Sequence, residues 1–215
     1  MGGYELKMSQ DQHAGKAPVI LIGGIPGVGK SSISGYIARK FGIDIVLSGD
    51  YLREFARPIL SEESQELLGV SVYEAWKKFG EENEENIRKG FLAQGSLLNK
   101  GLNAVLRRAV SNGEPLIAET LYFIPSQFDT DLMGQVTLLY IYISKKEVNS
   151  QRLLERGQYT HFNSTGKRLS DQLDRYRVMM EYSLKECREF GIRVFDNLVY
   201  TDTREEIIQY LSGLY

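Results

Sequence analysis

The sequence has 215 residues, of which 42% are hydrophobic and 25% are charged, and its formal net charge is −2. This length suits one α/β domain with an inserted lid and excludes two full enzyme domains. The near balance of charge gives no overall attraction to nucleic acid or to an anionic membrane. We therefore expect a single domain at residues 16–215, preceded by a polar, flexible arm at residues 1–15.

Neither a membrane segment nor a disulfide is expected. No apolar run approaches the length of a transmembrane helix, and the polar start of the chain lacks the apolar stretch of a signal peptide. The chain has one cysteine, Cys187, so it cannot form an intramolecular disulfide. Cys187 lies in a helical pattern, which favours packing or surface exposure over catalysis. These features predict a cytoplasmic protein.

The first predicted elements are an apolar strand and a helix, joined by a glycine-rich turn. Residues 21–42 read LIGGIPGVGKSSISGYIARKFG and contain the spacing G-x-x-x-x-G-K-S. This spacing is typical of a P-loop, whose main-chain N–H groups turn onto phosphate oxygens while the helix points its positive end at them. We assign nucleotide binding to seven residues here: Gly24, Gly27, Val28, Gly29, Lys30, Ser31 and Ser32.

Two side chains of this loop are expected to contact the nucleotide phosphates or a metal ion. Lys30 can reach the β- and γ-phosphates as a point charge, and the Ser31 hydroxyl can ligate Mg²⁺, which prefers hard oxygen ligands. The alternative is an ordinary glycine-rich turn between a strand and a helix. The apolar strand upstream and the helical pattern that ends at Gly42 favour the P-loop. ATP and Mg²⁺ are therefore the expected cofactors.

The elements that follow alternate between strands and helices. Residues 43–50 predict a strand that opens into a helix, and residues 84–110 predict one long helix or two in line, with a stop at Gly113. Three apolar runs suit strands buried in a parallel sheet: residues 114–120, 135–144 and 192–197. This order predicts an α/β fold of the P-loop NTPase type, with a doubly wound, mainly parallel sheet, helices on both faces and an inserted helical lid. Its ligand site should lie at the carboxyl ends of the strands.

Two carboxylates follow predicted strands at that edge. As a catalytic and substrate-binding residue, Asp50 could orient or deprotonate an acceptor hydroxyl, or it could hold a metal-bound water. Capping the next helix is an equally open role for it. Glu119 ends its strand, where it could hold Mg²⁺ through water or contact the substrate. A carboxylate at the tip of a buried strand is costly unless it has a partner, which favours a function for Glu119.

A basic, polar segment at residues 150–178 predicts a lid made of two helical arms and a connecting loop. Arg152 and Arg156 are four residues apart and share a helix face, which suits catalytic residues that close over phosphates. For any single arginine of this segment, a solvated basic face is the alternative. Three further arginines are candidates for binding an anionic acceptor: Arg53, Arg57 and Arg177.

Several stretches together resemble one family of kinases. They are GGIPGVGKSS, SGDYLREFARP, SVYEAWK, GFLAQ, LIAETLYFIP and RYRVMMEY, spread between Pro18 and about Asn197. With them the chain resembles archaeal-type 2-phosphoglycerate kinases, which use ATP to phosphorylate the 3-hydroxyl of 2-phosphoglycerate and form 2,3-bisphosphoglycerate. The chain departs from that pattern after Glu119: the family usually has Gly-x-His there, whereas Tyr122 takes the place of the histidine.

The resemblance implies an ATP- and Mg²⁺-dependent kinase of a small phosphorylated hydroxy acid, with no nucleic acid or membrane partner. Two alternatives remain open on the sequence. The first is a kinase of another small acceptor, such as a nucleoside, a sugar acid or an aminoacyl group on tRNA. The second is a nucleotide-binding switch without transfer activity, against which one set of residues argues: Lys30, Ser31, Asp50 and Glu119.

Overall fold

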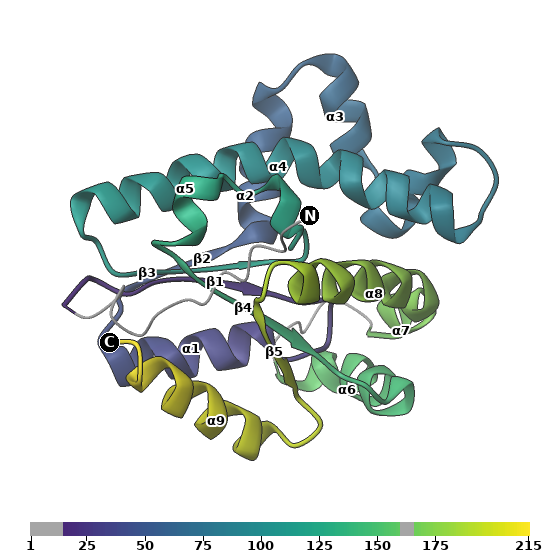
Figure 1. The fold of residues 1–215 in the computed structure, drawn as a ribbon. Coiled ribbons are helices and arrows are strands. Elements are labelled where there is room, and N and C mark those ends of the chain that lie inside the picture. Colours follow the sequence, from purple (N-terminus) through teal and green to yellow (C-terminus); the bar gives the residue numbers. More distant parts are fainter. Residues whose placement is uncertain (1–14, 160–165) are drawn as a thin grey trace, which may run out of the picture.

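A parallel β-sheet forms the centre of the computed structural model, which describes residues 15–159 and 166–215 (Figure 1). Its five strands lie in the order β2-β3-β1-β4-β5, and every neighbouring pair is parallel. The strands are β1 (Val19–Gly23), β2 (Ile45–Ser48), β3 (Leu116–Thr120), β4 (Thr137–Tyr142) and β5 (Arg193–Asp196). The predicted α/β fold with a parallel sheet is confirmed.

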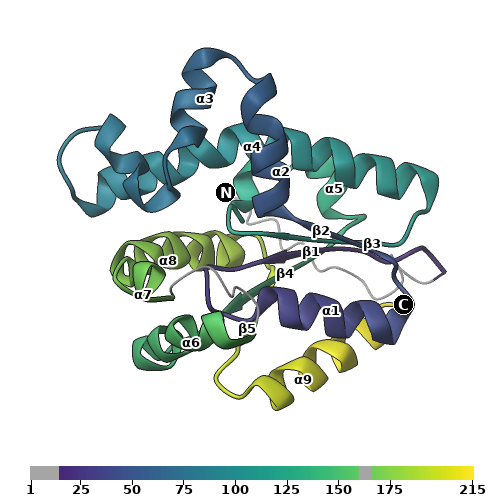
Figure 2. The same ribbon diagram turned by 180° about the vertical axis from the view of Figure 1, so that it is seen from behind.

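Helices cover both faces of this sheet. α1 (Lys30–Phe41) and α9 (Tyr200–Ser212) lie on one face, whereas α4 (Glu84–Asn112) and α8 (Leu173–Glu189) lie on the other (Figures 1 and 2). All residues of β1 and β3 are buried as a result, which explains their continuous apolar runs. The shorter helices, with η for 3₁₀, are α2 (Gly49–Ala56), η2 (Arg57–Ile59), α3 (Glu62–Gly69), η3 (Val72–Lys78), η4 (Pro125–Gln127), α5 (Thr130–Met133), α6 (Lys146–Tyr159) and α7 (Gly166–Ser170).

α4 is one unbroken helix of 29 residues, so the first of the two predicted alternatives holds. Asn83 caps its start by accepting a hydrogen bond from the N–H of Asn86, and Gly113 ends it in the left-handed conformation. The apolar residues of α4 recur every three or four positions except at Gln94 and Gly95. This interruption has a packing cause. A Cβ on Gly95 would lie 2.4 Å from Ile124 Cδ1, so the glycine lets the segment after β3 approach the helix.

The predicted capping role of Asp50 is wrong. Ser48 occupies the N-cap position of α2, and Asp50 lies inside the first turn of that helix. The helix begins earlier than expected because β2 ends at Ser48, directly before Gly49. The Asp50 side chain is exposed at the carboxyl edge of the sheet, where a ligand can meet it.

The described parts of the predicted lid are helical, and they form α6, α7 and the start of α8. The central lid residues 160–165 and residues 1–14 of the predicted arm at residues 1–15 lie outside the described residues. Cys187 is buried in α8, as the packing interpretation requires. Within residues 15–159 and 166–215, no helix combines the length and the apolar character needed to cross a membrane.

Candidate active site

The glycines of the phosphate loop adopt backbone conformations that other residues avoid. Gly24, Gly27 and Gly29 have φ angles of 154°, 80° and 92°. Gly29 is the N-cap residue of α1, and it offers no side chain to cap the helix. The first N–H groups of α1 are therefore available to a ligand, and the positive end of the helix favours an anion. The loop has the geometry of a phosphate cradle.

Two buried asparagines hold this loop from behind. Asn149 Nδ2 donates to the Pro26 carbonyl at 3.2 Å, and Asn197 Nδ2 donates to the Val28 carbonyl at 2.8 Å. Both amides are fully buried, and a Cβ on Gly29 would lie 2.8 Å from Asn197 Nδ2. The asparagines follow β4 and β5 at the ligand edge, a position that could have drawn attention to them. Neither asparagine was predicted from the sequence to support the loop.

Lys30 lies at the centre of the site. Its Nζ donates to the Ile25 carbonyl at 3.1 Å, so the side chain folds back across the loop. Burial lowers the pKa of Lys30, whereas the carboxylates of Glu119 and Asp50 raise it and Arg156 lowers it further. These four charged groups, drawn from four separate segments of the chain, therefore share one small region beside the phosphate loop.

The two side chains predicted to hold a metal ion are brought together. Ser31 Oγ donates to Glu119 Oε1 at 2.8 Å, and Ser34 Oγ donates to Glu119 Oε2 at 3.3 Å. Glu119 is buried near the end of β3, next to β1 and the phosphate loop. A hydroxyl and a carboxylate are hard oxygen donors, so this pair fits a magnesium ion bound mainly by phosphate and water oxygens.

The two lid arginines of α6 take different directions. Burial lowers the pKa of Arg156, and the carboxylates of Asp50 and Glu119 oppose that shift, so Arg156 lies close enough to both carboxylates to interact with them. Arg152 Nη2 donates to the Leu198 carbonyl at 2.9 Å, in the segment after β5. Contact with phosphate stays a prediction for both arginines, and Arg152 ties α6 to the segment after β5.

A group of buried tyrosines lies near Asp50. Burial raises the pKa of Tyr176, and Tyr73, Tyr122 and Asp50 act in the same direction. The rings of Tyr73 and Tyr176 meet edge to face with centroids 5.7 Å apart. Arg168 of α7 donates to the Tyr73 hydroxyl. Tyr122 was singled out in the sequence, whereas its grouping with Tyr73 and Tyr176 was not predicted, because tyrosines from distant segments carry no local signal.

Two of the three arginines predicted to bind the acceptor lie close together, and the third lies apart. Arg53 lies near Tyr122 and Asp50, since both Arg53 and Asp50 act on the Tyr122 hydroxyl. Arg53 and Arg57 both form ion pairs with Glu54, at 2.9 Å and 3.1 Å, and Arg57 is the more exposed of the two. Arg177 donates to the carbonyls that follow β4, Ile143 at 3.2 Å and Ser144 at 3.1 Å. The structure brings Arg53 to the site, and for the other two acceptor binding stays a prediction.

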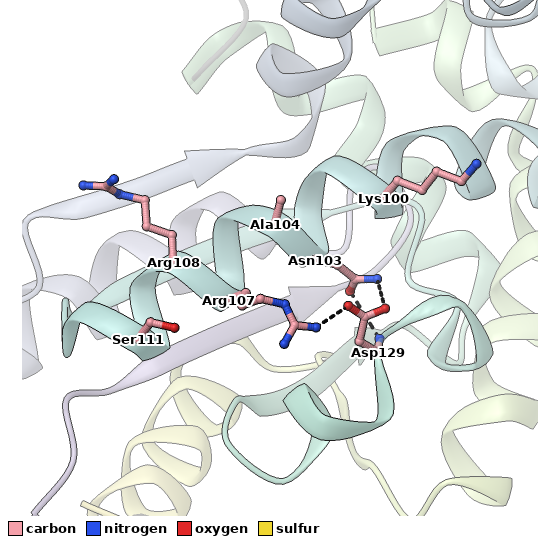
Figure 3. Close-up of a pocket in the computed structure, with 7 residues that line it drawn as sticks. All are labelled: Lys100, Asn103, Ala104, Arg107, Arg108, Ser111 and Asp129. Atoms are coloured by element: carbon pink, nitrogen blue, oxygen red, sulfur yellow. Dashed lines mark hydrogen bonds and ion pairs between the residues drawn. The ribbon is translucent and has the colours of Figure 1, made fainter.

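A groove separate from this site lies along the C-terminal half of α4 (Figure 3). α4 leads at its C-terminal end to the start of β3, so this groove faces the amino edge of the sheet, opposite the phosphate loop. In Figure 3, Arg107 and Asn103 point at Asp129, and both donate hydrogen bonds to it. Its lining is Lys100, Asn103, Ala104, Arg107, Arg108, Ser111 and Asp129. We assign no ligand to it, since its central charges already pair with one another.

A phosphate loop between β1 and α1, a carboxylate on the neighbouring strand and an arginine-bearing helix after β4 define a P-loop phosphotransferase. Comparison with known proteins agrees. The AAA domain family model matches residues 23–165. The fold also matches that of shikimate kinase from Acinetobacter baumannii, with a TM-score of 0.52, 16% identity and coverage of 92% of this chain and 94% of that one.

Two curated relatives identify the family of P-loop kinases to which the chain belongs. The chain is 46% identical to mevalonate-3-phosphate 5-kinase from Thermoplasma acidophilum over 88% of this chain and 93% of that protein. It is 30% identical to 2-phosphoglycerate kinase from Pyrococcus horikoshii over 89% of this chain, and it spans 63% of that longer protein. The chain therefore belongs to this family of ATP-dependent P-loop kinases that act on small molecules. The predicted resemblance is confirmed for the family, although not for the 2-phosphoglycerate kinases in particular.

Proposed function

We propose that this protein transfers the γ-phosphoryl group of ATP to the 5-hydroxyl of mevalonate 3-phosphate. The observation that carries this proposal is the 46% identity to the Thermoplasma enzyme, which extends over 93% of that enzyme's length. The neutral Tyr122 beside Asp50 supports it, because it differs from the histidine expected of 2-phosphoglycerate kinases.

In the proposed reaction the acceptor oxygen attacks the γ-phosphorus, a new O–P bond forms, and the bond to the bridging oxygen of ADP breaks. Asp50 accepts the proton that leaves the acceptor hydroxyl. Lys30 and Arg156 supply positive charge around the transferred group, where it stabilises the charge that develops. Ser31 and Glu119 would hold Mg²⁺, which when bound neutralises part of the phosphate charge.

The acceptor presents two anionic groups, a carboxylate and a phosphate, and the proposed partners for them are Arg53 and the cationic side chains of the lid. A second candidate acceptor is 2-phosphoglycerate, favoured by the 30% identity to the Pyrococcus enzyme. It carries the same two anionic groups, but its hydroxyl lies one carbon from the phosphorylated carbon, whereas in mevalonate 3-phosphate the distance is two carbons.

The deciding experiment measures ADP formation by the purified protein with ATP and Mg²⁺. Mevalonate 3-phosphate, mevalonate, 2-phosphoglycerate, 3-phosphoglycerate, a sugar acid and a nucleoside are compared as acceptors. We expect kcat/KM for mevalonate 3-phosphate to exceed that for 2-phosphoglycerate by about a hundredfold or more. Phosphorus NMR of the product should show two phosphate esters. Strong turnover of 2-phosphoglycerate alone would transfer the assignment to the second candidate, and turnover of another acceptor alone would reject both.

A further inference from the structure

A hydrogen bond joins two buried side chains close to Arg53 and Asp50. The Tyr122 hydroxyl donates to Gln94 Oε1 at 2.6 Å, and both residues are buried. The Tyr122 ring stacks on Phe91, with ring centroids 5.9 Å apart and planes tilted by 18°. The pair joins the segment after β3 to the middle of α4, two regions that are far apart in the sequence.

The Gln94 amide is held in one orientation. Its Nε2 donates to the Leu67 carbonyl at 2.6 Å and to the Val70 carbonyl at 3.1 Å. With the NH₂ group committed in this way, only the amide oxygen can face the tyrosine, so the hydroxyl of Tyr122 must donate. Burial raises the pKa of Tyr122, so the hydroxyl keeps its proton throughout the neutral range.

The same turn holds Arg53. Arg53 Nη2 donates to the Leu68 carbonyl and, at 2.9 Å, to the Val70 carbonyl that Gln94 also uses. A continuous set of hydrogen bonds therefore runs from Tyr122 through Gln94 and residue 70 to Arg53. Within the residues that the structure describes, Arg53 Nε is a buried donor without a hydrogen-bond partner. A ligand anion could satisfy that donor.

We propose that Tyr122 and Gln94 contribute to acceptor specificity by positioning Arg53 for one of the acceptor's anionic groups while adding no charge beside it. Both side chains are buried, so they act through Arg53 as positioning residues and do not contact the acceptor. The inference rests on the proposed function and deepens it, because it names the chemical class of acceptor that this arrangement fits.

This arrangement fits an acceptor whose hydroxyl lies further from its anionic groups than in a three-carbon acid. The neutral phenol adds no positive charge beside Arg53. A protonated histidine at position 122 would add a cation there and favour a shorter acceptor with its anionic groups close to the hydroxyl. Mevalonate 3-phosphate, whose hydroxyl lies two carbons from the phosphorylated carbon, therefore suits Tyr122 better than 2-phosphoglycerate.

The test compares Tyr122→Phe and Tyr122→His with the unchanged protein, using mevalonate 3-phosphate and 2-phosphoglycerate. Tyr122→Phe leaves the Gln94 oxygen unsatisfied and loosens Arg53, so KM for mevalonate 3-phosphate should rise about tenfold while kcat and KM for ATP change little. Tyr122→His should lower the preference for mevalonate 3-phosphate over 2-phosphoglycerate by about tenfold or more.

The histidine variant also provides a readout that a purely structural role would not change. Its kcat/KM for 2-phosphoglycerate, divided by that of the unchanged protein, should rise as the pH falls through the imidazole pKa of about 6.5. The ratio cancels the titration of the substrate phosphate. Tyr215→Phe is the matched control, because it removes a part-buried tyrosine hydroxyl that lies 2.8 Å from Thr137 Oγ1 at the opposite edge of the sheet.

The outcomes separate this inference from the proposed function. If the unchanged protein does not phosphorylate mevalonate 3-phosphate, the proposed function fails whatever the variants do. If it does, and Tyr122→His keeps its acceptor preference with a flat pH ratio, the inference is overturned. An equal rise in KM for ATP would also overturn it. If both Tyr122 variants fail to fold, Gln94→Met carries the same KM comparison.

Discussion

The nucleotide side and the acceptor side of this active site are built in different ways. The nucleotide side consists of one continuous segment, in which glycine backbone and the start of α1 face the phosphates. The acceptor side is assembled from side chains of α2, α4, α7, α8 and the segment after β3, among them Asp50, Arg53, Gln94 and Tyr122. Main-chain recognition needs only local sequence, whereas side-chain recognition needs the whole fold.

The largest expected effect tests the nucleotide side. Lys30→Ala should lower kcat by about 10²-fold or more, because it removes charge stabilisation from the transferred group. Lys40→Ala, at the exposed end of the same helix, is the matched control and should keep normal turnover. Steady-state kinetics with circular dichroism checks both variants. Near-normal turnover of a folded Lys30→Ala protein would contradict the phosphate-loop assignment.

The next effect separates the two sides. Asp50→Asn should lower kcat by about 10²-fold and leave the affinity for ATP unchanged, because ATP is held by the loop while Asp50 faces the acceptor. Single-turnover kinetics and calorimetric titration with a non-hydrolysable ATP analogue measure the two quantities. Asp44→Asn, an exposed carboxylate just before β2, provides the control. A loss of ATP affinity with transfer unchanged would make Asp50 a metal-holding or structural group.

A smaller effect tests how the acceptor is bound. Arg53→Ala should raise KM for the acceptor about tenfold, equal to about 1.4 kcal/mol for one charge-assisted contact, with little change in KM for ATP. The parallel variant Arg57→Ala removes the more exposed of the two arginines that pair with Glu54. We expect a change of less than about twofold for it. Equal effects of the two variants on KM for the acceptor would mean that Arg57 also binds the acceptor.

The smallest effect concerns the metal ion. Glu119→Gln keeps the size of the side chain but replaces the carboxylate, whose two oxygens accept hydrogen bonds from Ser31 and Ser34, with an uncharged amide. The Mg²⁺ concentration for half-maximal rate should rise roughly threefold to tenfold. The rate at saturating Mg²⁺ should fall by a smaller factor than this. Titration of activity with Mg²⁺ at fixed ATP measures the shift. An unchanged Mg²⁺ dependence would remove Glu119 from the metal site.

The sequence predictions succeeded where a feature depends on neighbouring residues. The loop from Gly24 to Ser31 has positive φ angles at its glycines and leads into α1 at Lys30, as a P-loop requires, whereas its contact with phosphate stays a prediction. Asp50 follows β2 at the ligand edge as predicted, but the capping role left open for it is excluded, because β2 ends two residues earlier and Ser48 caps α2. Asn149 and Asn197 were missed because their partners lie more than 120 residues away.

By itself, the sequence determined the P-loop, the parallel order of strands and helices, and the long helix that ends at Gly113. These features depend on spacing, periodicity and backbone freedom, which are local properties of the chain. Only the tertiary structure decided that Tyr122 meets Gln94, that Gln94 and Arg53 share the carbonyl of Val70, and that Arg156 comes near enough to Asp50 to interact with it. Side chains from separate elements come into contact only after the sheet and its helices have packed. The spacing of residues along the chain therefore cannot predict these contacts.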